Sequence, residues 1–274
     1  MTAQNPYRLP RHVVPKHYSI ELEPDLNDGS FDGRVVIELE VITETDTIVL
    51  NAAELEIEEV QVDQGDSVPA SSIVLDEDLE RAEFAFPIVL QPGTARLSCS
   101  FKGILNDKLR GFYRSTWSDD AGIDHVIATT QFESTNARRA FPCFDEPDLK
   151  ASFGVMLRVD NSLMTVSCGE LVSSTELENG LREDRFADTM VMSTYLVAFI
   201  VGELEATEAI DVDGVPLRIV HVPGKGDLTK FGLLAGEFSL KWLVNYYDIP
   251  YPAGKLDLIA VPDFAFGAME NLGC

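Results

Sequence analysis

Hydrophobic and polar residues alternate along much of the first two thirds of the chain. In residues 35–41 every second position, starting at Val35, is apolar, which is the period-two pattern of a half-buried β-strand. In residues 55–62 the alternation changes phase across Glu58 and Glu59, which predicts a β-bulge. Further strands are predicted at residues 84–90, 95–101, 126–132, 153–159 and 190–201.

Turn-forming residues separate these apolar runs. Asp28-Gly29 and Gln91-Pro92-Gly93 punctuate the strands, and Asn179-Gly180 is a strong signal for a tight hairpin. Many short strands joined by turns predict a mainly β fold, either an antiparallel β-sandwich or an open, saddle-like sheet.

The pattern changes after about residue 205. One more strand is predicted at 215–222, followed by a long helix and then by a strand at 255–261. Asp227 is a candidate N-cap of the helix or lies just before it, and Asp248-Ile249-Pro250 would end it. Five apolar side chains step by three or four and would line one helix face: Phe231, Leu234, Phe238, Trp242 and Tyr246.

A single helix and two strands cannot bury a core of their own. We therefore predict two domains, an N-terminal β domain at residues 1–205 and the opening part of a second domain at 206–274. The apolar helix face is expected to lack a partner within this chain, since the elements that would cover it are not part of the sequence.

The net charge of the chain limits the classes of molecule that it can bind. The 274 residues carry a formal net charge of −25, which disfavours binding to nucleic acid and to anionic membranes. The same charge attracts cations, including the protonated amino ends of peptides. No apolar stretch is long enough to cross a bilayer, and the N-terminal residues lack the apolar core of a signal peptide.

Cysteine and histidine usage offers little chemistry. The 4 cysteines form no C-x-x-C pair, so we expect buried, idle thiols and a reducing, cytoplasmic location. None of the four histidines begins an H-E-x-x-H pattern, and no two lie at helical ligand spacing; they are His12, His17, His125 and His221. We predict no metal site and no complete catalytic site within this chain.

One candidate binding segment follows the predicted strand 126–132. Gln131 and Glu133 are two positions apart, so their side chains would share one strand face and could present an amide and a carboxylate together. Two arginines and two acids follow within a few residues, and we expect them to form local ion pairs that fix a loop: Arg138, Arg139, Asp145 and Glu146.

A second candidate segment lies near the end of the sequence. Gly267 and Ala268 carry almost no side chain and would let another backbone approach closely. Glu270 is a lone acid in an apolar setting, where burial is costly unless a cation pairs with it. The alternative interpretation is a glycine-containing edge strand with one exposed glutamate.

Together the two segments resemble the M1 family of zinc aminopeptidases. Gly267-Ala268-Met269-Glu270-Asn271 matches the GAMEN exopeptidase motif of that family, and the segment running from Gln131 to Pro147 resembles its other hallmark. The chain looks most like bacterial aminopeptidase N proteins, and the resemblance covers essentially its whole length. It implies a saddle-shaped β domain followed by the start of a thermolysin-like α+β catalytic domain.

The resemblance also implies roles for individual residues. Glu270 would bind the free α-amino group of a peptide, with Glu133 as a second carboxylate. Gln131 would border the pocket for the first side chain. The backbone of Gly267 and Ala268 would hold the substrate as an added strand. Met269 and Asn271 belong to the same substrate-binding motif.

The sequence departs from the family pattern where the zinc ligands are expected. The family's H-E-x-x-H helix and its distal glutamate ligand do not occur in it. We therefore expect an N-terminal fragment that is inactive alone. Zinc would bind only in the full-length enzyme, whose remaining catalytic domain is this chain's natural partner. The alternative is a non-catalytic scaffold or binding protein with an aminopeptidase-like fold, although such a protein has no need of an amine-binding glutamate.

Overall fold

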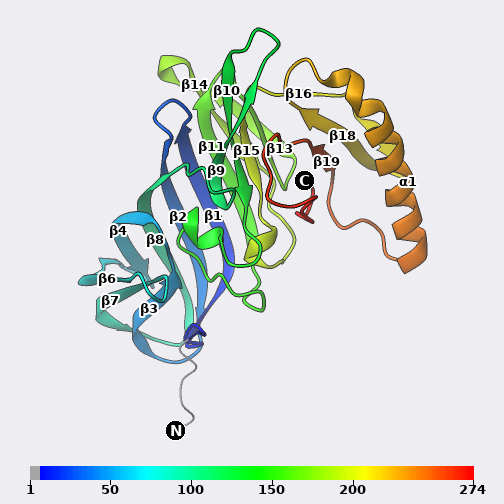
Figure 1. Cartoon of the computed structure of the whole chain (residues 1–274). Coiled ribbons are helices and arrows are strands. Elements are labelled where there is room, and N and C mark those ends of the chain that lie inside the picture. Colours follow the sequence, from blue (N-terminus) through cyan, green and yellow to red (C-terminus); the bar gives the residue numbers. More distant parts are fainter. Residues whose placement is uncertain (1–6) are drawn as a thin grey trace.

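The computed structural model describes residues 7–274 and is mainly β, as predicted (Figure 1). Its largest sheet has eight strands in the order β13-β14-β11-β1-β2-β8-β4-β5. The pairing is antiparallel throughout except between β1 and β11, which run parallel. The strands are β1 (Val13–Asp25), β2 (Ser30–Val41), β4 (Leu55–Asp63), β5 (Ser67–Pro69), β8 (Gly93–Ile104), β11 (Ser152–Asp160), β13 (Leu171–Glu176) and β14 (Leu181–Phe186).

Two smaller sheets pack against the large one. The first contains β3 (Thr45–Asn51), β7 (Arg81–Leu90) and β6 (Ser72–Asp76). The second contains β12 (Met164–Ser167), β15 (Phe199–Gly202), β10 (Asp124–Gln131) and β9 (Gly111–Ser118). Short 3₁₀ helices interrupt the loops, namely η1 (Ala137–Arg139), η2 (Glu178–Gly180), η3 (Thr194–Leu196) and η4 (Gly226–Leu228).

One continuous apolar core joins the large sheet to both smaller ones. Aromatic rings form its centre: Tyr18 stacks on Phe153 at 4.7 Å, and Phe132 meets the rings of Phe141 and Phe199 edge-on. Phe132 lies directly between Gln131 and Glu133, so this aromatic cluster anchors the first candidate binding segment.

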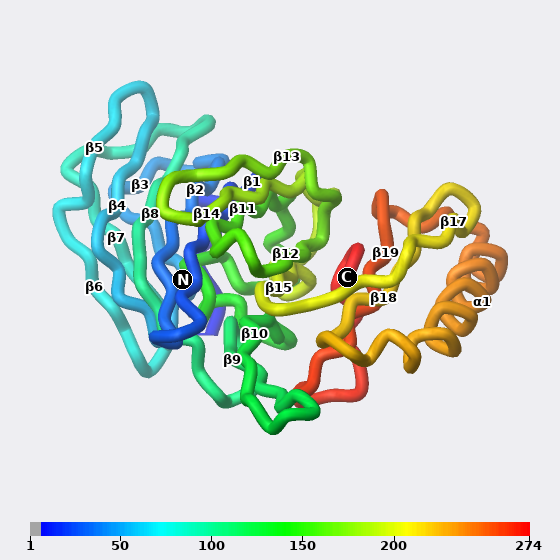
Figure 2. The backbone as a smooth tube through the Cα atoms, turned by 90° about the horizontal axis from the view of Figure 1, so that it is seen from above, coloured from blue at the N-terminus to red at the C-terminus, as the bar shows by residue number. Residues whose placement is uncertain are grey.

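A third small sheet and the long helix form the opposite end of the molecule (Figure 2). The sheet contains β16 (Glu205–Ala206), β18 (Val215–His221), β17 (Ile210–Val212) and β19 (Leu256–Ile259). Helix α1 (Thr229–Tyr247) covers it through Leu240, which packs with Val212 and Leu217. The last residues of the chain run back between this sheet and the four-stranded sheet (Figure 1).

Most predicted strands are confirmed. Strand β2 buries Val35, Ile37 and Leu39, and β4 shifts register between Ile57 and Glu59, as the phase change predicts. The predicted hairpin joins β13 to β14, and Asn179 has a positive φ of 64°.

The prediction of one strand at 190–201 is wrong. Only Phe199–Gly202 is a strand there, and Thr194–Leu196 is a 3₁₀ turn. Side-chain hydrogen bonds hold this irregular path, since Ser193 Oγ donates to Pro147 O and Thr194 Oγ1 donates to Phe144 O. Polar side chains that bond to distant backbone compete with strand pairing, and the apolar pattern does not reveal them.

The helix is confirmed, and so is its unpartnered apolar face. It ends at Asp248, which adopts the left-handed conformation with φ of 53°. Asp227 lies in the 3₁₀ turn ahead of the helix and provides no cap bond. The predicted face points to solvent, with exposed fractions from 50% at Trp242 to 80% at Phe231. No helix in residues 7–274 combines the length and apolar character needed to span a membrane.

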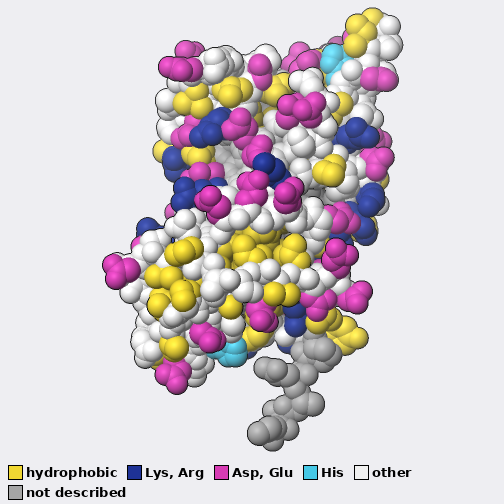
Figure 3. Space-filling view, turned by 90° about the vertical axis from the view of Figure 1, so that its left-hand side faces the viewer, with side chains coloured by type: hydrophobic (Ala, Val, Ile, Leu, Met, Phe, Trp, Pro, Cys, Tyr) yellow, Lys and Arg dark blue, Asp and Glu magenta, His cyan; other side chains and the backbone are white. Residues whose placement is uncertain are grey.

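The side of the molecule that carries β4, β6 and β7 shows acidic and basic side chains intermixed, with apolar side chains gathered over its middle and lower part (Figure 3). Exposed Val74 and Leu75 of β6 and Val89 of β7 contribute apolar surface to this small sheet. The net negative charge of the chain therefore does not appear on this face as an uninterrupted acidic surface.

Candidate amine-binding site

The segment that carries the second candidate motif is irregular rather than a strand. We call residues 262–273 the motif loop. Its beginning is tied to β9, because Tyr113 Oη donates to Asp263 O at 2.8 Å and Asp263 N donates to Ser115 Oγ at 2.9 Å. Its later part is tied to η3, because Asn271 Nδ2 donates to Leu196 O at 3.2 Å. The alternative interpretation of this segment as an edge strand is therefore wrong within this chain, because the loop bonds to β9 and to η3 instead of pairing along one strand.

Gly273 fixes the far end of the motif loop. Its φ is 81°, and a Cβ built on it would lie 2.1 Å from the carbonyl oxygen of Cys168. Its own carbonyl oxygen accepts hydrogen bonds from Lys255 Nζ at 2.7 Å and from Asp257 N at 3.0 Å. Only glycine fits both the left-handed conformation and the close approach to Cys168.

Gln131 and Glu133 differ in burial. Gln131 is only 2% exposed, and neither its amide oxygen nor its amide nitrogen has a hydrogen-bond partner among the described residues. Glu133 is exposed, just beyond the end of β10. The expected common strand face is therefore wrong, because the strand ends at Gln131 and its alternation does not continue. A buried amide without partners costs free energy, so the Gln131 side chain is suited to bond with a ligand.

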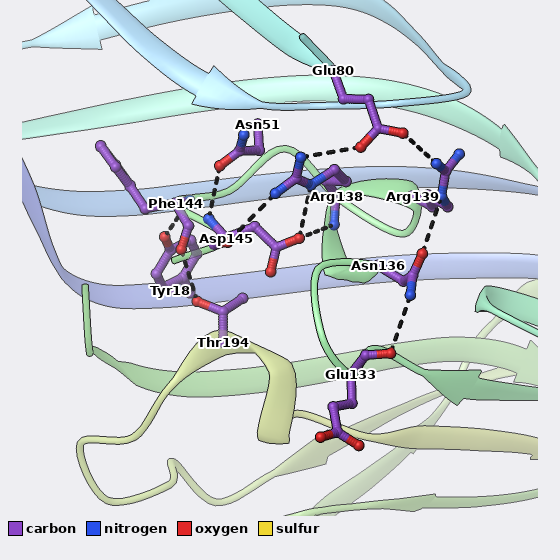
Figure 4. Close-up of polar contacts among 10 residues, drawn as sticks. All are labelled: Tyr18, Asn51, Glu80, Glu133, Asn136, Arg138, Arg139, Phe144, Asp145 and Thr194. Atoms are coloured by element: carbon purple, nitrogen blue, oxygen red, sulfur yellow. Dashed lines mark hydrogen bonds and ion pairs between the residues drawn. The ribbon is translucent and has the colours of Figure 1, made fainter. Parts of the chain in front are cut away.

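A chain of polar contacts supports the backbone at Glu133 (Figure 4). Asn136 Nδ2 donates to Glu133 O at 3.2 Å, and Arg139 Nε donates to Asn136 Oδ1 at 3.3 Å. Arg139 in turn pairs with Glu80, which lies at the turn before β7. The loop that carries Glu133 is thus fixed to the small three-stranded sheet.

The neighbouring Arg138 and Asp145 form the expected local ion pair, at 2.9 Å between Nε and Oδ2. Burial raises the pKa of the Asp145 carboxyl, and the charge and hydrogen bonds of Arg138 oppose that rise. Asp145 N donates to Asn51 Oδ1 of β3, and Phe144 N donates to Tyr18 Oη of β1, so this segment is linked to the small three-stranded sheet and to the large sheet (Figure 4).

The expectation that all four charged residues pair locally is wrong for two of them. Arg139 pairs with Glu54 and Glu80, and Glu146 pairs with Arg8 and Arg11 near the N-terminus. These partners are far away in sequence, so spacing could not identify them. The ion pairs join separate elements rather than closing one loop.

Glu270 is exposed, so the expectation of a buried acid at this position is wrong. The apolar neighbours in sequence do not enclose it, because Phe266, Gly267 and Ala268 are exposed as well. Burial, then Glu270 and then Glu133 raise the pKa of the Tyr195 phenol, so both carboxylates lie within electrostatic range of one hydroxyl.

Both carboxylates thus act electrostatically on Tyr195, a residue that the sequence analysis did not identify. Tyr195 belongs to η3, inside the segment interpreted as a strand, and that error concealed its position. The Ser193-Thr194 pair just before it was a usable signal, since adjacent hydroxyl residues favour turns.

The backbone at Gly267 is open. A Cβ built there would meet no atom within 4 Å, so nothing in the packing of the described residues requires glycine. A neighbouring cavity of about 600 Å³ is lined mostly by apolar groups, including Phe264 and Met269 of the motif loop and Leu258 of β19. Thr130, next to Gln131, and Met269 and Asn271, on either side of Glu270, also line this cavity, so it borders both candidate segments.

Potential metal-ligating side chains do not cluster in the part of the chain that the structure describes. Among residues 7–274, no three His, Cys, Asp or Glu side chains are arranged to hold a metal ion. The residues present therefore do not fit a zinc centre. The candidate residues are suited to bind a ligand.

All four cysteines are free thiols, and three are buried as predicted. Burial raises the pKa of Cys99 to about 12 and also raises that of Cys143, which keeps both thiols protonated and inert. Cys168 is buried too, but a hydrogen bond with Cys274 is the main reason that its pKa is lowered. Cys274 is only half-buried, so the expectation of complete burial does not extend to it.

Comparison with known families agrees with this mainly β architecture and its motif loop. A family model described as the Peptidase M1 N-terminal domain matches residues 14–196, and one described as the Peptidase family M1 domain matches residues 232–274. The first alone covers more than half of the chain, and the chain therefore belongs to peptidase family M1.

Its curated relatives are named aminopeptidases. The chain is 43% identical over 269 residues to a puromycin-sensitive aminopeptidase of Caenorhabditis elegans, and 40% identical over 271 residues to Aminopeptidase M1 of Arabidopsis thaliana. It is 41% identical over 273 residues to the mitochondrial Aminopeptidase 2 of Saccharomyces cerevisiae. Each match covers 97% of this chain but only 28% to 31% of the relative. The chain thus spans less than a third of the length of these relatives.

Proposed function

We propose that this chain provides the amine-recognition part of a zinc-dependent aminopeptidase that removes N-terminal residues from peptides. The proposal rests on two observations: Asn271, next to Glu270, is hydrogen-bonded to Leu196, next to Tyr195, and both Glu133 and Glu270 raise the pKa of the Tyr195 phenol although the two segments are more than a hundred residues apart. Membership of peptidase family M1 and the names of the relatives support the same activity.

The carboxylate pair explains how such an enzyme would select a chain end. A protonated α-amino group between Glu133 and Glu270 would form charge-assisted hydrogen bonds, which are the strong class of such bonds. An internal peptide bond or a blocked terminus offers no ammonium and would leave two acids facing each other unmatched. Gln131, with its unpartnered amide, would border the first side chain of the substrate.

The Gly267-Ala268-Met269-Glu270-Asn271 sequence would act as the GAMEN exopeptidase motif. The open backbone at Gly267 leaves room for a peptide to lie along it as an added strand. Asn271 would set the direction of Glu270 through its bonds to η3. Met269 would contribute apolar contact beside the peptide.

We further propose that residues 1–205 and 206–274 are separate domains and that the second continues in the full-length protein. The exposed face of α1, from Phe231 to Tyr246, would pack against that continuation, which would also provide the zinc ligands. The free thiols are compatible with a cytoplasmic location.

The experiment compares Glu270→Gln with the wild type in the full-length protein, on an alanyl reporter with a free amine and on its N-acetyl form. The substitution keeps the shape of the side chain and removes its charge. We expect wild-type protein to reject the acetylated reporter, and kcat/KM for the free amine to fall about 100-fold or more in Glu270→Gln.

Circular dichroism and thermal unfolding would show that the variant is folded. An unchanged kcat/KM in Glu270→Gln would overturn the assignment of Glu270. A wild-type protein that cleaves neither reporter would instead favour the non-catalytic scaffold.

A further inference from the structure

Two cysteines from distant parts of the sequence meet where the motif loop ends. Cys168 directly follows β12, and the backbone of Gly273 packs on it so closely that an added Cβ would lie 2.1 Å from its carbonyl oxygen and 3.5 Å from its Cα. Cys274 is the next residue, packs against the same apolar core and shares a side-chain hydrogen bond with Cys168. One thiol lies within each of the two family matches, so this contact joins the two matched parts.

The sulfur of Cys168 receives donors that favour its thiolate form. Ala198 N donates to Cys168 Sγ at 3.2 Å, whereas the carbonyl oxygens of Leu196 and Ala198 lie farther from this sulfur, at 3.6 and 3.8 Å. The hydrogen bond from Cys274 lowers the pKa of Cys168 most, burial opposes it, and Ala198 and the charge of Lys255 lower it further. Cys168 is therefore the more nucleophilic thiol of the pair.

A buried ammonium group lies beside the second thiol. Lys255 is only 8% exposed, and its Nζ lies 4.0 Å from Cys274 Sγ and 2.9 Å from Asp257 Oδ2. Arg218 already occupies both oxygens of Asp257, at 2.7 and 3.1 Å. Two cations thus share one carboxylate, and a thiolate in the neighbouring thiol pair would balance the excess positive charge.

A small molecule can reach this pair from one side. Cys274 is half-buried and lines the cavity of about 600 Å³ beside the motif loop, which exposed Gly267 and Ala268 also line. Cys168 is 4% exposed and does not line the cavity, so it lies behind Cys274 as seen from there. An oxidant that enters the cavity would therefore meet Cys274 first.

We propose that Cys168 and Cys274 form an oxidisable thiol pair, which a small peroxide converts into a disulfide between the end of the motif loop and the turn after β12. This inference does not depend on the proposed peptidase activity. The disulfide would fix the loop that carries Glu270, four residues before Cys274, to the N-terminal β domain.

The oxidation proceeds in two balanced steps. The sulfur of Cys274 attacks one peroxide oxygen and breaks the O–O bond, which gives a sulfenic acid and hydroxide. The thiolate of Cys168 then attacks that sulfur, so that the S–S bond forms, the S–O bond breaks and a second hydroxide leaves. The two hydroxides take up the two thiol protons. With hydrogen peroxide, two thiols become one disulfide and the oxidant is reduced to water.

The test treats the reduced full-length protein with hydrogen peroxide, blocks the remaining thiols with iodoacetamide after denaturation, and maps the peptides by mass spectrometry without reduction. Reduced glutathione treated in parallel shows that the peroxide dose is effective. We expect a linked peptide that joins Cys168 to Cys274, two hydrogens lighter than the sum of its parts and lost on treatment with dithiothreitol. Cys99 and Cys143, which are fully buried, should be recovered as blocked thiols.

Two variants identify the order of the steps. In Cys168→Ala the second thiol is missing, so we expect the linked peptide to disappear and the sulfenic acid of Cys274 to be trapped by dimedone. Cys143→Ala is the matched control, because it removes another buried thiol, and it should form the link as the wild type does. Thermal unfolding of both variants shows whether they are folded.

The wild-type protein alone decides the main point. Recovery of Cys168 and Cys274 as blocked thiols at a dose that oxidises glutathione would overturn the proposal. Irreversible oxidation of Cys274 without a link, or a link from either cysteine to a different thiol, would overturn it as well.

Discussion

The side-chain amide of Asn271 donates to the backbone carbonyl oxygen of Leu196 at 3.2 Å, which joins the residue after Glu270 to the residue after Tyr195. The same amide also reaches the carbonyl oxygen of Val197, at 3.4 Å. Through this contact the motif loop of the second family match is fixed to a 3₁₀ turn of the first. This asparagine therefore ties the motif loop beside Glu270 to the turn that carries Tyr195.

Asn271→Asp should loosen this contact without changing the size of the side chain. An ionised carboxylate has no N–H to donate and would face two carbonyl oxygens. We expect KM for peptides to rise and kcat/KM to fall about tenfold, the effect of one lost hydrogen bond plus repulsion. Steady-state kinetics of the full-length protein would measure it, with Asn27→Asp in an exposed turn as control. Equal kinetics in the two variants would contradict the role of the contact.

Asn136→Ala should weaken the support of Glu133. It removes the donor to Glu133 O and the acceptor for Arg139 Nε, while Arg139 keeps its ion pairs with Glu54 and Glu80. We expect Asn136→Ala to lower kcat/KM about two- to tenfold. This effect is smaller than that of losing the Glu133 carboxylate, because the variant only displaces the loop. If Asn136→Ala and Glu133→Gln lowered kcat/KM equally, Asn136 would have a larger role than positioning.

Arg138→Met should destabilise the fold strongly. The substitution leaves Asp145, only 3% exposed, without its ion-pair partner at 2.9 Å, and breaking a buried pair costs about 3–5 kcal/mol. Urea unfolding would measure the loss. Asp145→Asn in the Arg138→Met background should recover part of the stability, because a neutral amide needs no counter-charge.

The pH dependence of Arg138→Met follows from the raised pKa of Asp145. Since burial favours its protonated form in the folded state, the folded state binds the proton more tightly than the unfolded state. The stability of the variant is therefore greatest in acid, below the ordinary aspartate pKa, and falls as pH rises through the raised folded value. A defect that stayed constant from about pH 4 to pH 7 would contradict this explanation.

Zinc titration tests the interpretation of the histidines. His12 and His17 lie in or near the start of β1, His125 stacks on Trp117, and His221 lies at the end of β18. Both ring nitrogens of His125 contact carboxylates, those of Asp119 and Glu203, so neither nitrogen is free to bind a metal ion. We expect calorimetry on this chain to detect no tight stoichiometric zinc site. A tight zinc site that is lost when one histidine is replaced would contradict the prediction that these histidines bind no metal.

Short runs of consecutive residues were enough to predict individual strands, bulges and turns of the fold. The alternation around Val35, the bulge at Glu58 and the turn at Asn179 each follow from a few consecutive residues, and the structure contains all three. The motif at Gly267 was also visible, because its residues are contiguous.

Features that depend on distant contacts could not be predicted in this way. The parallel pairing of β1 with β11 and the ion pairs of Arg139 join residues far apart in sequence. Tyr195 was missed because bonds from Ser193 and Thr194 to distant carbonyls turn an apolar run into a 3₁₀ helix. Glu270 lies in a loop that is anchored to residues far away in sequence at both ends, and spacing alone does not reveal such anchors.

Two glycines of the motif loop should respond to substitution in opposite ways. At Gly273 an added Cβ would meet the carbonyl oxygen of Cys168 at 2.1 Å with φ at 81°, so Gly273→Ala should destabilise the fold by about 2 kcal/mol or more. At Gly267 an added Cβ would meet nothing within 4 Å, so Gly267→Ala should leave the unfolding free energy unchanged. If a peptide backbone lies along Gly267, that same variant should raise KM for peptides in the full-length protein, since the methyl group occupies the space of the ligand. Thermal unfolding and steady-state kinetics on both variants separate the two roles. A Gly267→Ala protein with wild-type stability and wild-type KM would mean that the substrate does not approach the loop at this residue.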